Sequence, residues 1–381
     1  MERKTFAIGN IRPPFHANSL LLQVTENCTW NRCNFCTLYK GGTFRMRSAE
    51  DVKKDIDVVA YYRNRIFEKF NGKNFDMNKI MAEYSLLDEE EQSCFAMVFN
   101  WIRSDGMKTV FLQDANTIVL KKEMLIDILK HLKKTLPTLE TVACYGRADA
   151  LIRLSVEDFR ELKEAGLTMI HSGFESGCNE VLEILNKGTT RELQIESGKR
   201  VKEAGIEFNV FYMPGSGGRS LSEKNAIDTA DVINKVNPDY IRIRTFVVKP
   251  DAPMWHVANG PDFDECSDIE KLKELRLMIE HLDGVNSYLI SDHIINLLPM
   301  LEGYIDKDKE KMLKYIDDFL KMPKDKQMEF QLARRMCYNV DYTQMDYMPS
   351  KDMKGIRDVI AGVTDEEYWE EILRRYLRRY I

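Results

Sequence analysis

The sequence predicts an α/β fold, a partial (β/α)6 TIM-like barrel with a mainly helical C-terminal extension. Over the first 250 residues, short apolar runs alternate with longer stretches of helical periodicity. This alternation is typical of βαβ units and a parallel sheet. After Pro250 the alternation stops, and residues 268–381 read as mainly helical. We therefore expect a barrel domain over residues 1–250 and a helical extension over residues 251–381.

Six apolar runs are predicted as barrel strands, too few for a closed eight-stranded barrel but suited to an open one. They cover residues 19–24, 109–113, 141–145, 166–174, 206–213 and 240–248. The helices are predicted at residues 49–70, 122–134, 155–165, twice within 178–204, and at 221–236. A helical insertion is expected from about residue 62 to residue 105. In such sheets the chemistry lies at the C-terminal ends of the strands.

Local signals support these helix boundaries. Ser155, with Asp158 three residues later, is typical of a helix N-cap. The segments 163–167 and 202–206 share the pattern Lys-Glu-Ala-Gly followed by an aliphatic residue. Each glycine is expected to end a helix just before the next strand.

Bulk composition excludes several classes of protein. The net charge of −6 argues against a general nucleic-acid binder, because phosphate binding requires clustered Lys and Arg. No stretch approaches the roughly 18–20 apolar residues of a membrane span, and the N-terminal residues 1–15 have no apolar core like that of a secretory signal. We therefore expect a soluble cytoplasmic protein without a membrane partner.

Three cysteines lie close together directly after the first predicted strand. Cys28, Cys33 and Cys36 have the spacing Cys-x4-Cys-x2-Cys. Three thiolates on one loop can bind three irons of a [4Fe-4S] cluster and leave the fourth iron open. A structural zinc site would need a fourth ligand at a regular spacing, and neither His16 nor His171 lies in such a pair.

A third alternative is that these cysteines bind no metal and belong to the core. Polar neighbours, Asn31, Arg32 and Asn34, argue against that alternative. The other five cysteines form no Cys-x2-Cys pair, and each is expected to be an ordinary buried thiol. They are Cys94, Cys144, Cys178, Cys266 and Cys337.

On the cysteine motif and the strand ends described next, residues 19–250 resemble the radical S-adenosylmethionine (radical SAM) superfamily. They look most like its branch with oxygen-independent coproporphyrinogen oxidase and the tRNA methylthiotransferases. The resemblance implies that SAM fills the open iron position. The usual family motif has three residues between the first two cysteines, whereas this chain has four.

The resemblance also implies SAM contacts. Phe35 matches an aromatic position near the adenine. Asp114 and Asn116, after the second strand, stand where the family has a glycine-rich motif for the SAM amino group, although a turn capped by Asp and Asn is the alternative. Arg147, after the third strand, would pair with the SAM carboxylate, unless it forms a plain surface salt bridge. Glu175, after the fourth strand, would face the ribose or the amino group.

Further family landmarks end the fourth and fifth strands. Ser176 completes a segment, Gly173 to Ser176, that resembles the family's Gly-x-Gln/Glu-Ser. Met213 and Gly215 lie at the edge where the family places adenine, and glycine there permits close approach to a flat ligand. Residues 43–47, Thr-Phe-Arg-Met-Arg, are expected either to offset the charge of the cluster, to contact the substrate, or to be structural.

His293 is the candidate catalytic residue on the substrate side. Ser291 reads as an N-cap that places Asp292 and His293 in the first turn of a helix in the extension. Such a turn suits an anionic group, and its imidazole can donate a hydrogen bond or a proton near neutral pH. The alternative is that Asp292 complements the helix dipole and His293 has no catalytic role.

The resemblance implies an anaerobic enzyme that reductively cleaves SAM at the cluster. The resulting 5′-deoxyadenosyl radical would abstract hydrogen from a small molecule or peptide. An electron donor such as flavodoxin or ferredoxin is the expected partner. Modification of RNA or protein remains an alternative, as does a non-catalytic iron-sulfur electron carrier or iron chaperone. The sequence names neither the substrate nor whether SAM is consumed or regenerated.

Overall fold

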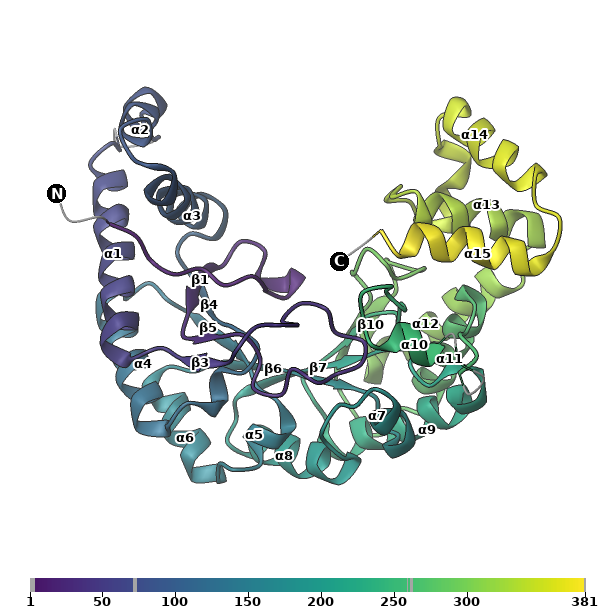
Figure 1. Cartoon of the computed structure of the whole chain (residues 1–381), viewed down its shortest axis with the longest axis horizontal. Helices are drawn as coiled ribbons and strands as arrows, with labels where there is room; N and C mark the ends of the chain where they lie inside the picture. The colour runs from purple at the N-terminus through teal and green to yellow at the C-terminus, as the bar shows by residue number, and fades with distance from the viewer. Residues whose placement is uncertain (1–3, 71–73, 259, 261–262, 380–381) are drawn as a thin grey trace. The chain divides into compact units, whose positions relative to one another are not determined.

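The computed structural model describes residues 4–70, 74–258, 260 and 263–379. The chain forms two compact units. The first comprises residues 1–31, 41–172 and 200–207, and the second comprises residues 32–40, 173–199 and 208–381. Eight strands are assigned to one sheet in the order β1-β4-β5-β6-β7-β8-β9-β10 (Figure 1). The α/β class is thus confirmed.

The first unit is built on parallel strands that match the predicted runs closely. β1 (Leu20–Gln23) pairs with β4 (Thr109–Gln113), which pairs with β5 (Thr141–Tyr145). β5 pairs in turn with β6 (Met169–Glu175), and the boundary between the two units falls inside β6. Parallel pairing brings the carboxyl ends of these strands to one edge, so the residues after each strand become neighbours.

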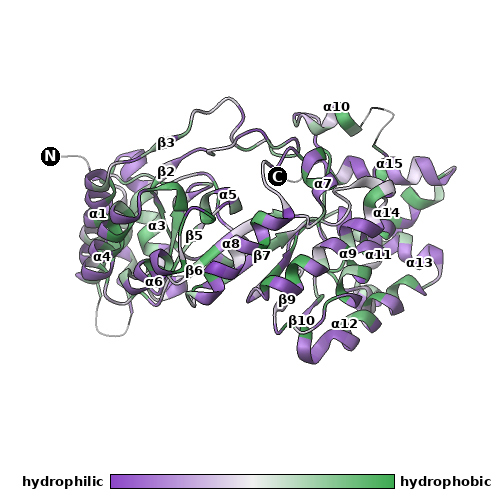
Figure 2. Cartoon of the chain, turned by 90° about the horizontal axis from the view of Figure 1, so that it is seen from below, coloured by the Kyte–Doolittle hydropathy of each residue, from purple (hydrophilic) through white to green (hydrophobic). Residues whose placement is uncertain are grey.

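Amphipathic helices cover the strands of the first unit. α1 (Ala49–Phe67) begins at an N-cap, Ser48, and buries Val52, Ile56, Val59 and Ile66, which is the spacing of one helix face. It packs against α4 (Lys122–Thr135). In Figure 2 the strands are mostly green, whereas these helices carry purple, hydrophilic residues.

The predicted insertion contains two helices, α2 (Met77–Tyr84) and α3 (Glu89–Asp105). Met97 of α3 packs on a buried cluster from four strands, Leu21, Phe111, Ala143 and Met169. The insertion therefore contributes to the core of the first unit. The predicted capping box of Ser155 and Asp158 opens α6 (Val156–Ala165), and Gly166 ends it.

The second unit continues the strand pattern with β7 (Glu207–Tyr212) and β8 (Tyr240–Ile243), which are parallel. Two short strands follow that the sequence analysis assigned to a helical region. β9 (Tyr288–Ile290) pairs in parallel with β8, and β10 (Glu302–Tyr304) pairs antiparallel with β9. Residues 268–381 are otherwise mainly helical, as predicted, and these two strands were missed because three residues are too few to show alternation.

Helices make up the rest of the second unit and the remaining connections. Between strands they are α5 (Ala148–Leu151), α7 (Asn179–Ile184), α8 (Arg191–Glu203), α9 (Gly218–Val236), α10 (Met254–Ala258) and α11 (Asp268–Glu280). After β10 they are α12 (Ile305–Leu320), α13 (Lys324–Arg335), α14 (Ser350–Ala361) and α15 (Glu366–Leu377). Among the described residues, no helix combines the length and the apolar character that crossing a membrane requires.

The C-terminal helices share a small core in which Leu332, Ile356, Trp369 and Leu373 are buried. A buried ion pair also anchors them, because Arg335 donates to both carboxylate oxygens of Asp268 at 2.8 and 2.9 Å. Glu370, next to Trp369 in the sequence, has a pKa raised to about 7. Burial of its carboxyl group is the larger cause, and the negative charge of Asp268 is the second. The helical character predicted for residues after 305 is confirmed.

Stability should therefore depend on pH through Glu370. The pKa of the Glu370 carboxyl group is higher in the folded chain than its value of 4.5 in the unfolded chain. Its contribution to the free energy of unfolding is therefore fully present below pH 4.5 and is lost as the pH rises through 7. We expect Glu370→Gln to raise the free energy of unfolding at pH 8 by at most about 3 kcal/mol and to change little at pH 5. Urea unfolding at both pH values measures this. Exposed Glu367→Gln, on the same helix, is the control, and an equal gain at pH 5 would contradict the assignment.

Candidate functional site

The cysteine loop is held in place by asparagine side chains. Asn27 and Asn31 have positive φ angles of 64° and 47°, a conformation that Asn tolerates better than most residues. Their side-chain amides donate to the carbonyls of Thr43 and Gly42. Farther along, the Asn34 amide donates to the Ile184 carbonyl at 2.7 Å. The loop conformation thus depends on these polar neighbours of the cysteines.

None of the three cysteines of the motif forms a disulfide. Cys28 and Cys36 are half-buried, and Cys33 is buried. Cys28 belongs to the first unit, whereas Cys33 and Cys36 belong to the second. In the second unit the ammonium of Lys40 donates to the Cys33 carbonyl at 3.0 Å.

In the first unit, Asn116 joins the cysteine loop to two strand ends. Its Nδ2 donates to the hydroxyl of Thr29, next to Cys28, at 3.0 Å, and its Oδ1 accepts from the Arg147 backbone N–H at 3.1 Å. Both ends of this buried amide are therefore bonded within the protein. The Arg147 guanidinium lies 5.6 Å from the Trp30 ring centroid, and its Nε pairs with Asp149 at 2.9 Å. The side chains of Arg147 and Asp149 are 9% and 29% exposed, so this salt bridge is partly buried.

Asp114 is almost completely buried after β4. Its Oδ2 accepts from the Gln23 side chain at 2.9 Å, and its backbone N–H donates to the Thr25 hydroxyl at 3.1 Å. A Cβ on Gly9 would come within 2.6 Å of Asp114 Oδ1. The carboxylate is thus packed between the end of β1 and the N-terminal segment.

In the second unit, Glu175 forms a buried ion pair at the end of β6. Its Oε1 lies 3.0 Å from Nζ of Lys187, and their side chains are 12% and 9% exposed. Glu175 has a φ angle of 64°, which is uncommon for a residue with a long side chain and is often found at functional sites. A Cβ on Gly173 would lie 2.3 Å from Glu175 Oε1, so glycine is required there. Lys187 Nζ also lies 5.6 Å from the Phe35 ring centroid.

A second buried carboxylate, Glu274 of α11, organises the turn after β7. Its Oε1 accepts from the Tyr212 hydroxyl at 2.7 Å, the Gly215 N–H at 3.0 Å and the Asn225 amide at 2.7 Å. Its Oε2 accepts from Ser222 at 2.6 Å. Burial raises the pKa of Glu274, against these hydrogen bonds.

The predicted adenine edge is attached to this network. Met213 donates its N–H to the Glu175 carbonyl at 2.8 Å, and Ser176 is hydrogen-bonded to Asn225. Gly215 has a φ angle of 87°, and a Cβ there would lie 2.6 Å from Cγ of Lys271. The close neighbour that explains this glycine is therefore a lysine stem of the same unit.

The helix predicted after Ser291 is absent; residues 291–300 form an irregular loop after β9. The prediction is wrong because residues 288–290 extend the sheet, and polar side chains then fix the loop. Asp292 pairs with Arg242 of β8 at 2.8 Å, and Asn296 Oδ1 accepts from the N–H of Thr245 at 2.9 Å. His293 is half-buried, and burial together with Arg244, Arg242 and Lys249 lowers its pKa to about 3. Its imidazole is thus neutral near pH 7 and holds no extra proton to donate.

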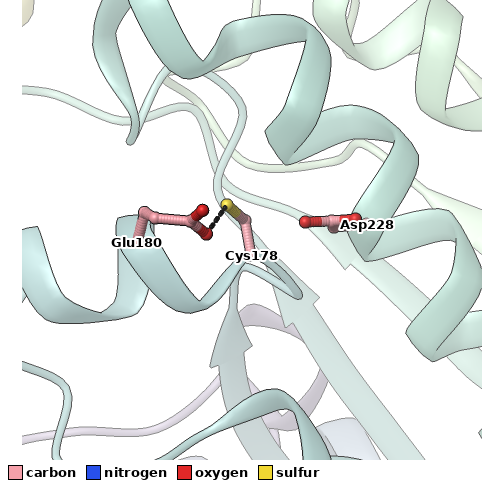
Figure 3. Close-up of side chains that lie close together, drawn as sticks. All are labelled: Cys178, Glu180 and Asp228. Carbon is pink, nitrogen blue, oxygen red and sulfur yellow. Dashed lines mark hydrogen bonds between the residues drawn. The ribbon is translucent and has the colours of Figure 1, made fainter.

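Two other groups of ligand-type side chains are already satisfied. His16 and His171, in the first unit, bring their Nε2 atoms within 2.9 Å of each other. Cys178, Glu180 and Asp228, in the second, place their ligand atoms within 4.8 Å of one another (Figure 3). Lys224 Nζ lies 2.9 Å from Glu180 and 2.7 Å from Asp228, so an ammonium already supplies the cation there.

Residues 96–230 match the model of the radical SAM superfamily. The chain carries a radical SAM domain. A curated relative, the heme chaperone HemW of Bacillus subtilis (strain 168), is 21% identical over 227 residues, which are 57% of this chain. The chain spans 58% of the length of that relative. The superfamily predicted from the sequence is confirmed, and the HemW match agrees with the predicted branch.

Two solved structures are similar to this chain at low sequence identity. Coproporphyrinogen III oxidase (HemN) from Escherichia coli is 13% identical with a TM-score of 0.44, over 91% of this chain and 86% of that chain. Elp3 of the archaeon Methanocaldococcus infernus is 14% identical with a TM-score of 0.42, over 58% of this chain and 57% of that chain.

The radical SAM family consists of enzymes that use a [4Fe-4S] cluster and SAM, as predicted for this chain. The cysteine loop suits the cluster, since its three cysteines form no disulfide and come from one short loop. Cys28, Cys33 and Cys36 would supply three thiolates to the cluster and leave its fourth iron open.

Several residues of the site escaped the sequence analysis. Lys187 is 12 residues away in sequence from its partner Glu175. Glu274 is 59 residues away from Gly215, from whose N–H it accepts a hydrogen bond. Their local sequences read as a turn after a helix and as the polar face of a helix. One expectation about cysteines is also wrong: Cys337 is exposed, because it follows the end of α13 with a φ angle of 71°.

Breaking the Glu175–Lys187 pair should destabilise the protein. Lys187→Met leaves a buried carboxylate without its cation, so we expect a loss of about 3 kcal/mol in the free energy of unfolding. The double variant Glu175→Gln/Lys187→Met should lose clearly less, because neither charge remains. Urea unfolding of all variants, with exposed Lys199→Met as the control, measures the coupling. Equal losses in the single and double variants would show that the pair has no such role.

Proposed function

We propose that this chain reductively cleaves SAM at a [4Fe-4S] cluster bound by Cys28, Cys33 and Cys36. The observation that carries the proposal is the Cys-x4-Cys-x2-Cys loop, without a disulfide, just after the first strand of a chain that matches the radical SAM superfamily over residues 96–230. When bound, the cluster and SAM supply an electron and a 5′-deoxyadenosyl radical that abstracts hydrogen from a small-molecule or peptide substrate. Modification of RNA or protein remains the alternative for the substrate class.

The chain's own residues would orient SAM and shield it from water. In the second unit, Glu175 is positioned by Lys187 and is the candidate acceptor for SAM hydroxyl or amino groups. Phe35 beside Lys187, together with the Met213–Gly215 edge, is the candidate surface for adenine. In the first unit, Asp114 is the candidate for the SAM amino group and Arg147 for its carboxylate. Asn116 and Ser176 have hydrogen bonds within the protein, so we propose that they position these groups.

A one-electron donor is needed for this reaction. We propose flavodoxin or ferredoxin as that partner, because radical SAM chemistry needs a one-electron reductant, and the cytoplasm as the location where the two would meet. No described residue group suggests a nucleic-acid surface, and the net charge of −6 supports a small-molecule or peptide substrate.

Iron content tests the cluster. Anaerobically reconstituted protein should hold about four irons per chain, with a brown absorbance that air destroys. Replacing Cys28, Cys33 and Cys36 together by Ala should remove nearly all of this iron, because the thiolates are its ligands. The exposed Cys337→Ala variant should keep it. A full cluster in the triple variant would refute the assignment.

SAM binding tests the two carboxylates. With a strong reductant, the protein should release 5′-deoxyadenosine slowly even without substrate. Glu175→Ala and Asp114→Ala should weaken SAM binding about tenfold or more, the value of one or two charged hydrogen bonds, with iron content near normal. Exposed Glu183→Ala should match the parent. Parent-like SAM affinity in both variants would show that neither carboxylate binds SAM.

A further inference from the structure

Two loops of the second unit lie side by side at the carboxyl ends of β8 and β9. In the parallel register Arg242 stands opposite Ile290, so the residues that follow both strands leave the sheet together. The Arg242–Asp292 ion pair joins the two loops. Asn296 adds a second connection, since its Nδ2 donates to the Ile243 carbonyl at 2.7 Å. The relative position of residues 244–249 and 291–296 is therefore fixed by bonds on both sides.

These loops carry three half-buried nitrogen donors, Arg244, Lys249 and His293. The charges of Arg244 and Lys249 both act on the His293 imidazole, and that of Arg244 also acts on Lys249. The Arg242–Asp292 pair and the Thr245–Asn296 hydrogen bond, on either side of Arg244 and His293 in the sequence, hold the two segments that carry these residues together. Every charge that shifts the pKa of His293 is cationic, the third being that of Arg242, whose own partner is Asp292.

The tautomer of His293 follows from its backbone contact. The N–H of Ile295 donates to His293 Nδ1 at 3.3 Å, so Nδ1 carries no proton. Because the neutral imidazole has one N–H, that proton is on Nε2. His293 is therefore a hydrogen-bond donor beside two cations, and it cannot act as an acid at neutral pH.

The same segment packs against the cysteine loop of the second unit. Phe35 packs on a cluster that contains Phe246, Val248 and Met254. The N–H of Met254 donates to the Asn34 carbonyl at 2.8 Å. Lys249 follows Val248 directly, and the Cys36 thiol is among the groups whose charge it senses. The segment that carries Lys249 thus packs beside Asn34 and Phe35 of the cysteine loop, where a substrate would meet the cofactors.

We propose that Arg244, Lys249 and His293 form a binding site for an anionic group of the substrate, a carboxylate or a phosphate. The inference rests on the proposed function and specifies its substrate class. An anion beside these two cations would be stabilised by both charges, in addition to the opposite charge that Asp251 supplies to Lys249. Guanidinium, ammonium and imidazole N–H together offer donors in several directions, as carboxylate and phosphate oxygens require. An RNA substrate would need a wider basic surface than this site of two cations.

Anion titration of the full chain with its reconstituted cluster tests this site. Inorganic phosphate and succinate are titrated separately by anaerobic calorimetry, in the absence and presence of saturating SAM. We expect one of them to bind, also with SAM present, and the better ligand distinguishes a phosphate from a carboxylate substrate. Lys249→Gln should weaken binding about tenfold, and Arg244→Gln/Lys249→Gln should abolish it. Lys351→Gln/Lys354→Gln, which removes two exposed charges from the same unit, should have no effect.

Three outcomes would overturn the inference. In the first, neither anion binds the parent protein. In the second, SAM displaces the bound anion. In the third, the Lys351→Gln/Lys354→Gln control weakens binding as much as Arg244→Gln/Lys249→Gln does. Displacement by SAM would assign the cations to the SAM carboxylate instead. For His293, Gln should retain more anion affinity than Phe, because only Gln replaces the N–H donor. Iron content and SAM cleavage are measured on the same samples. If both are normal but no anion binds, the inference fails and the proposed function stands; if both are absent, the proposed function fails.

Discussion

The hydrogen bonds of the Glu274 side chain are the interactions on which the turn after β7 in the second unit depends. Four donors converge on its two oxygens, from the end of β7, the following turn and α9. The carboxylate itself comes from α11, so one buried group fixes three elements together. Burial opposes its ionisation, and such a group is tolerated only because its hydrogen-bonding capacity is filled. Loss of the Ser222 hydroxyl would remove the donor described for Oε2, whereas Oε1 would keep two of its three donors after the loss of any one.

The network reaches the end of β6 through Asn225. This amide donates to Glu274 and is hydrogen-bonded to Ser176, next to Glu175. The Glu175 carboxylate is stabilised differently from that of Glu274, because its partner is a cation, Lys187, at 3.0 Å. A carboxylate paired with a single lysine retains lone pairs for a ligand, whereas Glu274 uses both oxygens within the protein. This contrast supports Glu175 as the ligand-binding carboxylate and Glu274 as the positioning one.

Local patterns made the first two thirds of the chain predictable. The β4 and β5 boundaries agree with the predicted runs, and the capping box of α6 is where Ser155 and Asp158 indicate. These features depend on residues within about one helical turn or one strand. The cysteine motif is equally local, since nine residues contain all three thiols. By contrast, β9 and β10 have three residues each and are stabilised by pairing with distant strands, which no short window records.

Polar partners far apart in sequence account for the rest of the site. Asn116 bonds to Thr29 across 87 residues, which explains why its side chain could not be assigned from the sequence alone. His293 shows the same limit in a sharper form. The sequence indicated a helix N-terminus as the source of positive potential, but β9 ends there and the loop carries no helix. The positive potential comes instead from Arg244 and Lys249, which belong to the preceding strand end and come beside His293 only because β8 and β9 pair in parallel. An anion-binding role can therefore be argued at this position for a physical reason different from the predicted one.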